Sequence, residues 1–206
     1  MRPAVIGLAG GVGSGKSTVA RAFERLGCLV SDSDAGVREL LARGEVIERL
    51  RSWWGDGVVA PDGAADRRAI AAIVFGDDAE RLRLEALLHP MLRATREALI
   101  ERAAREGAPG VIIDAPLLFE VGLDAECDAV VFVRVPREVR LARVASGRGW
   151  DEGELARREA AQIPVEEKRR RSDHEIDNST DTGALDSAAR RILAQVRQGL
   201  HSISDG

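Results

Sequence analysis

The chain has 206 residues, of which 45% are hydrophobic and 31% charged, with a formal net charge of −4. This length supports one sizeable hydrophobic core but is short for two independent domains of ordinary size. The charge gives no general attraction to nucleic acid or to an anionic membrane, and two distant cysteines, Cys28 and Cys127, make no disulfide framework. We therefore expect a single-domain cytoplasmic protein that binds neither nucleic acid nor membrane.

Short apolar runs rich in valine, isoleucine and leucine predict the strands. They lie at 4–9, 28–31, 111–114, 129–135 and, more weakly, 174–177. Helical patterns with a 3.6-residue period separate them, which is typical of a parallel sheet covered on both faces. We expect an α/β fold: a three-layer α/β/α sandwich around a parallel sheet of about five strands.

The first apolar run leads into a glycine-rich loop at 10–17 that matches the pattern G-x-x-x-x-G-K-[ST]. Glycines let successive backbone N–H groups turn inward, and the start of the following helix adds partial positive charge. Only Lys16 and Lys168 are lysines among the 30 basic residues, which indicates a strict demand for lysine at position 16. A glycine-rich helix cap with an accidental lysine is the alternative.

A nucleoside triphosphate is the ligand that this loop predicts. Lys16 would reach its β and γ phosphates, and the Ser17 hydroxyl would bind Mg²⁺. The residues expected to bind ATP here are Gly11, Val12, Gly13, Ser14, Gly15, Lys16, Ser17 and Thr18. The chain lacks the Asp-x-x-Gly motif of a switch GTPase, which favours an ATPase or a small-molecule kinase.

Two aspartates, Asp32 and Asp34, follow the second apolar run. Ligands of a doubly wound sheet lie outside the carboxyl ends of its strands, and a carboxylate there can orient or accept the proton of an attacking hydroxyl. We expect one aspartate to cap the next helix and Asp34 to act on the hydroxyl. Arg38, one helical turn after Asp34, would contact both that carboxylate and a substrate phosphate.

Roughly eighty residues with helical periodicity separate the second and third runs, far more than a crossover needs. One apolar helical face includes Leu84, Leu88 and Leu92, and Pro90 would kink a continuous helix or start a new one after His89. We expect a helical insertion at 45–105 over one edge of the site. The charged interval 148–171 predicts a mobile lid, and the core would then comprise 1–44, 106–147 and 172–206.

Further polar residues follow the later strands. Asp114 ends the third run, where P-loop enzymes support Mg²⁺, although any apolar strand that ends in aspartate would look the same. Arginines after the fourth run, including Arg143 and Arg148, would stabilise charge on a moving phosphoryl group, or would be solvated surface. Acidic residues flank the basic run at 168–171 and no aromatic platform accompanies it, which argues against nucleic acid.

Several motifs together resemble the dephospho-CoA kinase family over nearly the whole chain. They are Asp32, Asp34 and Arg38; Asp66 and Arg67; Leu88, His89 and Pro90; Pro116, Leu117, Leu118, Phe119 and Glu120; Arg143 and Arg148; Gln162; and Ile176, Asp177 and Asn178. The resemblance implies a P-loop kinase fold and transfer of the γ-phosphate of ATP, with Mg²⁺, to the ribose 3′-hydroxyl of dephospho-CoA, the last step of coenzyme A biosynthesis.

The resemblance also implies residue roles. Asp34 would orient or deprotonate the hydroxyl, and Arg148 would be the lid arginine at the phosphates. Arg143 would stack on the adenine with Asn178 beside it. The dephospho-CoA site would be shaped by Asp34, Arg38, His89, Pro116, Leu117, Leu118 and Glu120. The chain departs from the family pattern at Ser33, where alanine is usual, and at Arg140, where glutamine is common.

Alternatives stay open for single residues and for the whole chain. His89 before a proline could cap a helix, and Asn178 could be a turn residue that ends the last strand. The chain could be another small-molecule P-loop kinase acting on a nucleoside or nucleotide, or an ATPase or regulatory binding module whose insertion docks a protein. Asp34 and Arg38, together with 116–120, favour a second small-molecule site and thus a kinase. We expect this kinase to be cytoplasmic and monomeric.

Overall fold

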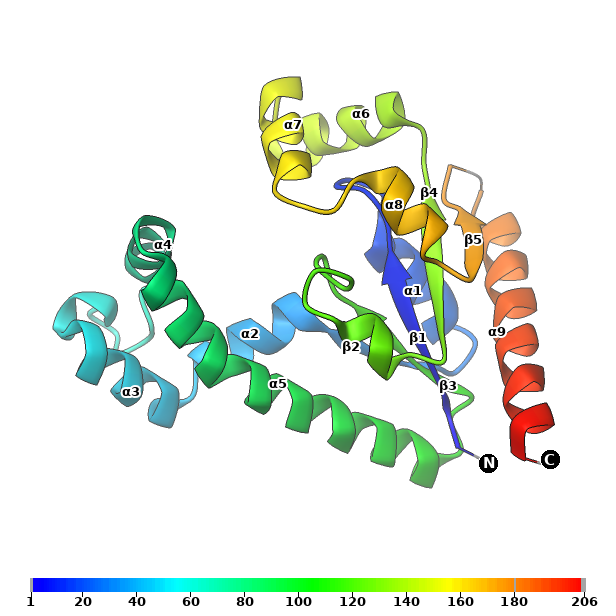
Figure 1. Ribbon diagram of the computed structural model, residues 1–206, viewed down its shortest axis with the longest axis horizontal. Helices are drawn as coiled ribbons and strands as arrows, with labels where there is room; N and C mark the ends of the chain where they lie inside the picture. Colours follow the sequence, from blue (N-terminus) through cyan, green and yellow to red (C-terminus); the bar gives the residue numbers. More distant parts are fainter. Residues whose placement is uncertain (1, 180, 205–206) are drawn as a thin grey trace. The chain divides into compact units, whose positions relative to one another are not determined.

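The computed structural model describes the backbone of residues 2–179 and 181–204, with side chains up to residue 200. The chain forms two compact units, one comprising 1–32 and 99–206 and the other 33–98. Figure 1 labels the helices and strands of both units.

A five-stranded sheet with the strand order β2-β3-β1-β4-β5 forms the centre of the first unit. Its strands are β1 (Ala4–Ala9), β2 (Leu29–Asp32), β3 (Gly110–Asp114), β4 (Ala129–Arg134) and β5 (His174–Asp177). All neighbouring strands are parallel, and the register pairs Asp114 with both Leu8 and Asp32. The expected parallel sheet is therefore confirmed; β2 begins and ends one residue later than the apolar run suggested.

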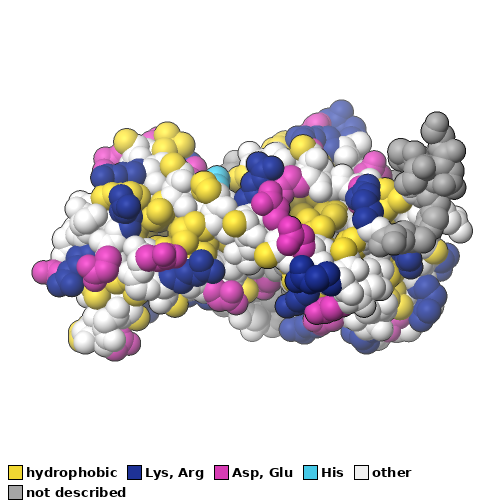
Figure 2. All heavy atoms as spheres, turned by 90° about the horizontal axis from the view of Figure 1, so that it is seen from below, with side chains coloured by type: hydrophobic (Ala, Val, Ile, Leu, Met, Phe, Trp, Pro, Cys, Tyr) yellow, Lys and Arg dark blue, Asp and Glu magenta, His cyan; other side chains and the backbone are white. Residues whose placement is uncertain are grey.

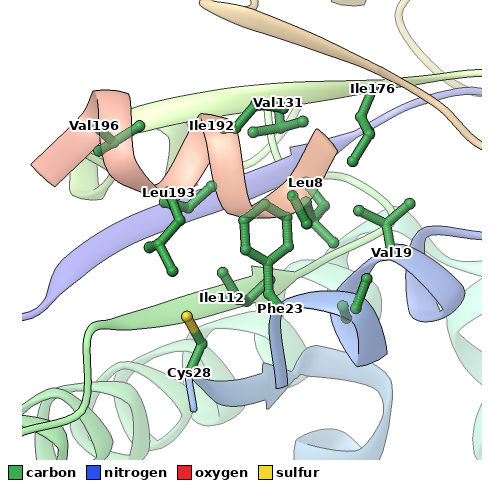
Figure 3. Packing of buried hydrophobic residues seen from close by; sticks show 14 of the residues in the cluster. Leu8, Val19, Phe23, Cys28, Ile112, Val131, Ile176, Ile192, Leu193 and Val196 are labelled. Atoms are coloured by element: carbon green, nitrogen blue, oxygen red, sulfur yellow. The ribbon is translucent and has the colours of Figure 1, made fainter. Parts of the chain in front are cut away.

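One face of the sheet is covered by α1 (Lys16–Glu24) and α9 (Thr182–Ser204). Figure 3 shows Phe23 of α1 packed among Leu8, Ile112 and Ile192 of this core, and the Phe23 side chain is fully buried. Leu185, Ile192 and Val196 of α9 are buried here and lie on one face of the helix, with the spacing of an amphipathic helix.

Cys28 is buried in the same core, just before β2. Its burial raises the pKa of the thiol to about 12. The thiol therefore stays protonated at neutral pH, and it serves as a small hydrophobic side chain.

The opposite face of the sheet packs against the segment after β3, the 3-10 helix η2 (Leu123–Glu126) and the end of α5 (Asp78–Glu106). Ala4, Ile6 and Leu8 of β1 face the first core, whereas Val5 and Ala9 face the second. This alternation is the pattern of a strand that is buried on both faces. The three-layer arrangement expected from the sequence is confirmed.

Three further helices follow β4: α6 (Arg137–Arg148), α7 (Glu152–Ala160) and α8 (Val165–Arg170). Helices α6 and α7 lie beyond the carboxyl ends of the strands (Figure 1). Helix α8 leads back along the sheet to Asp173, whose N–H donates to the Val130 carbonyl near the start of β4 at 2.9 Å. The charged interval 148–171 thus contains two helices. Leu155 of α7 is fully buried despite the many charged residues around it. This interval has an apolar anchor that its composition did not suggest.

The second unit is helical. It comprises α2 (Ser33–Leu41), α3 (Gly44–Trp54), the 3-10 helix η1 (Asp56–Val58), α4 (Arg67–Gly76) and the first part of α5. Asp66 caps α4 by accepting hydrogen bonds from the backbone N–H groups of Arg68 and Ala69 at 2.9 and 3.1 Å. The buried hydrophobic residues that form the core of this unit are Leu40, Leu41, Val46, Leu50, Val58, Ile70 and Leu88.

Helix α5 runs through Pro90 without ending there. A new helix therefore does not start after His89, and of the two predicted outcomes that one is wrong. Leu88 is buried, and Leu84, Leu87, Met91 and Leu92 pack against the same core, so the predicted apolar face holds the helix despite the missing N–H.

The surface mixes charges of both signs. Lys or Arg and Asp or Glu side chains are interspersed on the face shown in Figure 2. Over the ranges 2–179 and 181–204, none of the helices has the length and low polarity needed to cross a membrane.

Candidate active site

The loop between β1 and α1 has the curled backbone expected of a phosphate-binding loop. Gly13 and Gly15 adopt left-handed φ angles of 78° and 75°, which side chains disfavour. The Ser14 N–H donates to the Gly11 carbonyl at 3.1 Å, and the Gly15 carbonyl accepts from Thr18 N–H at 2.9 Å. Gly15 precedes α1 without a side-chain cap, so the positive end of the helix dipole lies at the loop.

Two residues from distant parts of the chain contact the carbonyl oxygens of this loop. Asn178 Nδ2 donates to the Ser14 oxygen at 2.8 Å and to the Gly15 oxygen at 3.2 Å. Arg143 donates from Nη1 to the Ser14 oxygen at 3.3 Å and from Nη2 to the Asn178 oxygen at 2.7 Å. The structure therefore brings both predicted adenine-site residues to the P-loop.

Arg140 also holds the loop. Its side chain is buried, Nη1 donates to the Val12 oxygen at 3.1 Å, and the same group pairs with Glu159 of α7. In the sequence, Arg140 stands out as a departure from the family pattern and as one of the arginines after the fourth apolar run. In the structure, Arg140 of α6 connects this helix to the P-loop through Val12 and to α7 through Glu159.

The two oxygen ligands expected for Mg²⁺ occupy adjacent elements. Ser17 is the second residue of α1 and is exposed, while Asp114 is the last residue of β3 and is half-buried. No group of three or more His, Cys, Asp or Glu side chains that could hold a metal occurs among the described residues. One hydroxyl and one carboxylate fit Mg²⁺, which prefers oxygen and takes many of its ligands from water and phosphate.

Three polar candidates of the acceptor site, Asp34, Arg38 and His89, lie in the second unit. Asp34 lies in the first turn of α2, with Arg38 one turn later, and both side chains are exposed. His89 is exposed and lies in the interior of α5, which begins at Asp78 and ends at Glu106. The interpretation of His89 as a helix cap is therefore wrong, because the backbone continues as helix on both sides of it.

The turn at 116–120 divides its side chains between core and surface. Leu118 and Phe119 are 1% and 5% exposed and belong to the core beneath the sheet, whereas Leu117 is 40% exposed. Pro116 is half-buried. Of the predicted contacts in this turn, Leu117 is the apolar side chain that solvent reaches most.

Glu120 at the end of this turn is bound from the lid interval. Lys168 Nζ lies 2.9 Å from Glu120 Oε1 and donates to Gln162 Oε1 at 2.9 Å, and Ile163 N–H donates to Glu120 Oε1 at 2.9 Å. Burial alone would raise the pKa of Glu120, but the bonds from Lys168 and from the backbone N–H groups of Glu120 and Ile163 hold it below its usual value. Lys168 was not among the predicted site residues, although the scarcity of lysine marks it as clearly as Lys16.

Arg148, the predicted lid arginine, is the last residue of α6. Its guanidinium lies 4.7 Å from the centre of the Trp150 ring, and Arg158 of α7 lies 4.9 Å from the same ring. Arginine stacks well on indole, so Trp150 restricts where both guanidinium groups lie.

Comparison with known proteins agrees with these features. The family model described as dephospho-CoA kinase (CoaE) matches residues 4–183. A dephospho-CoA kinase of Anaeromyxobacter dehalogenans is 42% identical over 196 residues, which cover 95% of this chain and 93% of that protein. A crystal structure of a Thermus thermophilus protein is 37% identical, covers 95% of this chain and 98% of that one, and superimposes with a TM-score of 0.80.

A structure of dephospho-CoA kinase from Campylobacter jejuni, 20% identical, shares the fold with a TM-score of 0.61 over 93% of this chain and 96% of that one. These similarities support the resemblance drawn from the motifs and not the alternatives of a nucleoside kinase or an ATPase module. The chain thus belongs to the dephospho-CoA kinase family and is a kinase of coenzyme A biosynthesis.

Proposed function

We propose that this chain transfers the γ-phosphoryl group of ATP to the ribose 3′-hydroxyl of dephospho-CoA and releases coenzyme A and ADP. The curled loop between β1 and α1 is the observation that carries the donor half of this proposal. The family assignment supports the acceptor.

In this proposal the loop residues Gly11 to Thr18 bind the phosphates through backbone N–H groups and the start of α1. Lys16, the first residue of α1, places its ammonium group at the β and γ phosphates. A lysine suits this position because its charge is compact and its stem is slim, whereas arginine needs more room. Lys16 thus neutralises charge on the group that moves.

Ser17 and Asp114 would hold Mg²⁺ that arrives with ATP. When bound, the ion neutralises charge on the phosphate oxygens. The hydroxyl of Ser17 and the carboxylate of Asp114 supply the hard oxygen ligands that the ion prefers. The protein's part is to fix the position of these two oxygens at the ends of β3 and α1.

Asp34 is the proposed general base. Its carboxylate accepts the proton of the 3′-hydroxyl as the oxygen of that hydroxyl bonds to the γ-phosphorus and the bond to the β,γ-bridging oxygen breaks. Arg38 orients Asp34 and contacts a phosphate of the acceptor, and Arg148 stabilises the charge spread over the transferred group. The exposed side chains of Asp34 and Arg38 on α2 are consistent with contact to a substrate.

The remaining binding roles follow from the same proposal. The helical insertion at 45–105, with His89, binds dephospho-CoA together with Pro116 and Leu117. Leu118 and Glu120 shape that site indirectly by fixing the turn at 116–120, because Leu118 is in the core and Glu120 is held by Lys168. Arg143 and Asn178 lie beside the adenine, and the interval 148–171 acts as a lid on a core of 1–44, 106–147 and 172–206. The enzyme is a cytoplasmic monomer.

An assay of ADP release tests the function directly. The purified chain is given MgATP with dephospho-CoA, with adenosine or shikimate, or with no acceptor, and the product is identified by mass spectrometry. We expect ADP release to depend on dephospho-CoA and to match formation of coenzyme A. Equal ADP release without an acceptor would indicate an ATPase, and faster turnover with adenosine would indicate a nucleoside kinase.

A further inference from the structure

We propose that Asn178 and Arg143 are positioning residues that fix the direction of the P-loop N–H groups, in addition to any contact with the nucleotide base. The inference rests on the proposed function, because it takes the loop at 10–17 as the site of the ATP phosphates. Asn178 and Arg143 would act through the backbone of Ser14 and Gly15.

The peptide geometry supplies the first step. In a trans peptide the C=O of one residue and the N–H of the next point in opposite directions. Asn178 Nδ2 and Arg143 Nη1 both donate to the Ser14 carbonyl, at 2.8 and 3.3 Å. The Gly15 N–H must therefore point away from Asn178 and Arg143.

The same reasoning applies one residue later. Asn178 Nδ2 also donates to the Gly15 carbonyl at 3.2 Å, which Thr18 N–H and Val19 N–H approach at 2.9 and 3.3 Å from within α1. These bonds hold the Gly15 carbonyl and so set the direction of the Lys16 N–H. One amide side chain thus orients two consecutive peptide planes of the loop.

Asn178 is itself firmly held. Its side chain is 4% exposed, its N–H donates to the Arg134 carbonyl at 3.1 Å beside the β4–β5 pairing, and its carbonyl accepts from Arg143 Nη2 at 2.7 Å. The sheet and α6 therefore fix the Asn178 backbone before any ligand binds, and burial restricts the side-chain amide that it carries. A group that is already oriented costs less free energy to use when phosphate arrives.

The glycine at position 15 fits this arrangement. A Cβ atom on Gly15 would lie 2.5 Å from Asn178 Nδ2. Only glycine permits the amide to approach the loop this closely, apart from the left-handed φ of 75° at the same residue. The loop sequence and Asn178 are thus matched to each other sterically as well as through hydrogen bonds.

A ligand without a base separates positioning from adenine contact. Inorganic tripolyphosphate carries the phosphate chain of ATP but no adenine. If Asn178 positions the loop, Asn178→Ala should weaken binding of tripolyphosphate about tenfold for the loss of two hydrogen bonds, and should weaken binding of ATP by at least the same factor. If Asn178 only contacts the base, ATP binding should weaken while tripolyphosphate binding stays unchanged, and the proposal would be wrong.

The experiment measures both dissociation constants by isothermal titration calorimetry for the wild-type chain and for three variants. Arg143→Ala removes the second donor to the Ser14 carbonyl. Because Arg143 is exposed on α6, this variant should fold and can serve as the test if Asn178→Ala does not fold. Arg137→Ala is the matched control: it removes the same charge from α6, where Arg137 pairs with Glu152 at 2.6 Å instead of with the loop.

We expect Asn178→Ala and Arg143→Ala to raise the KM for ATP, to leave the KM for dephospho-CoA unchanged and to shift the amide ¹⁵N resonances of Gly15 and Lys16. Arg137→Ala should move none of these. Unchanged amide resonances, or unchanged tripolyphosphate binding in both variants, would overturn the inference while the wild-type activity stands. A wild-type chain that binds neither ligand would overturn the proposed function together with it.

Discussion

Lys168 Nζ lies 2.9 Å from Glu120 Oε1, and this ion pair joins α8 to the turn after β3. The Lys168 side chain is 3% exposed and that of Glu120 17% exposed. Gln162 and Ile163 complete the cluster from the same lid interval as Lys168. The far end of the interval 148–171 is therefore fastened to the core by a buried charge pair.

Replacing Lys168 by Met should destabilise the fold strongly. Loss of one partner leaves the Glu120 carboxylate desolvated and uncompensated, so we expect the free energy of unfolding to fall by about 3 kcal/mol. Chemical denaturation measures the change. Arg170→Met, which breaks an exposed pair with Glu167 on the same helix, is the control and should cost less than about 1 kcal/mol. An equal fall in the free energy of unfolding in the two variants would show that the buried pair stabilises the fold no more than the exposed pair.

Stability at acidic pH should depend on Glu120. The folded-state pKa of this carboxyl lies below its ordinary value of 4.5, because the bonds from Lys168 and two backbone N–H groups outweigh burial. Its stabilising contribution is therefore complete above the ordinary pKa and is lost as the pH falls through the lower folded-state value. Over an acidic pH series, the midpoint temperature of thermal unfolding should fall less steeply with decreasing pH in Glu120→Gln than in the wild-type chain. Identical slopes would contradict this assignment.

The variant Asp34→Asn should lower kcat by about a hundredfold or more and leave ATP binding nearly unchanged, since the amide cannot take the hydroxyl proton. Steady-state kinetics and ATP titration measure the two effects. Glu39→Gln removes an exposed carboxylate from the same helix and serves as the control, with kcat expected near that of the wild-type chain. A normal kcat for Asp34→Asn would remove its proposed role as base.

Lys16→Ala should abolish transfer without unfolding the chain, because the side chain begins α1 at the phosphate loop and is not part of the hydrophobic core. The far-UV circular dichroism spectrum should match that of the wild-type chain while ADP release falls to background. Arg21→Ala, which removes an exposed cation one turn further along α1, should retain activity. Loss of the helical spectrum in Lys16→Ala would point to a structural role instead.

Gly13→Ala should impair both stability and activity. The residue has a φ of 78°, and the new Cβ would lie 2.9 Å from the Arg140 carbonyl oxygen and from Val144 Cγ1. We expect a loss of about 1–2 kcal/mol from the left-handed backbone alone, measurable by thermal denaturation. Gly199→Ala is the matched control: it lies in α9 with open space around it, so stability should rise by about 0.5–1 kcal/mol. Unchanged stability and activity in Gly13→Ala would contradict both the backbone strain and the steric contact with α6.

The sheet and the phosphate loop could be predicted because their signals are local. Continuous apolar runs mark strands that are buried on both faces, and the glycine pattern at 10–17 lies between a strand and a helix, as its chemistry requires. The same holds for the apolar face of α5, whose period survives Pro90. In these cases short-range pattern and tertiary environment agree.

The partners of buried polar residues could not be predicted, because they depend on contacts between distant segments. Lys168 reads as part of a basic surface run, yet it is buried against Glu120, 48 positions earlier in the printed sequence. Arg140 and Asn178 reach the P-loop only once β4, α6 and β5 are assembled. His89 illustrates the opposite error: a proline after it suggested a helix boundary, but packing of Leu88 and its neighbours outweighs the loss of one backbone bond.

The Cys28 thiol, enclosed between α1, α9 and the sheet, also gives this protein an internal reporter of its own opening (Figure 3). Thiolate is the form that attacks a disulfide reagent, so a thiol that is shielded and fully protonated in the native chain reacts only through molecules that have exposed it. In a chain that carries Cys127→Ser, a chromogenic disulfide reagent would therefore label Cys28 alone. The labelling rate would report how often the core around Cys28 unfolds, without added denaturant.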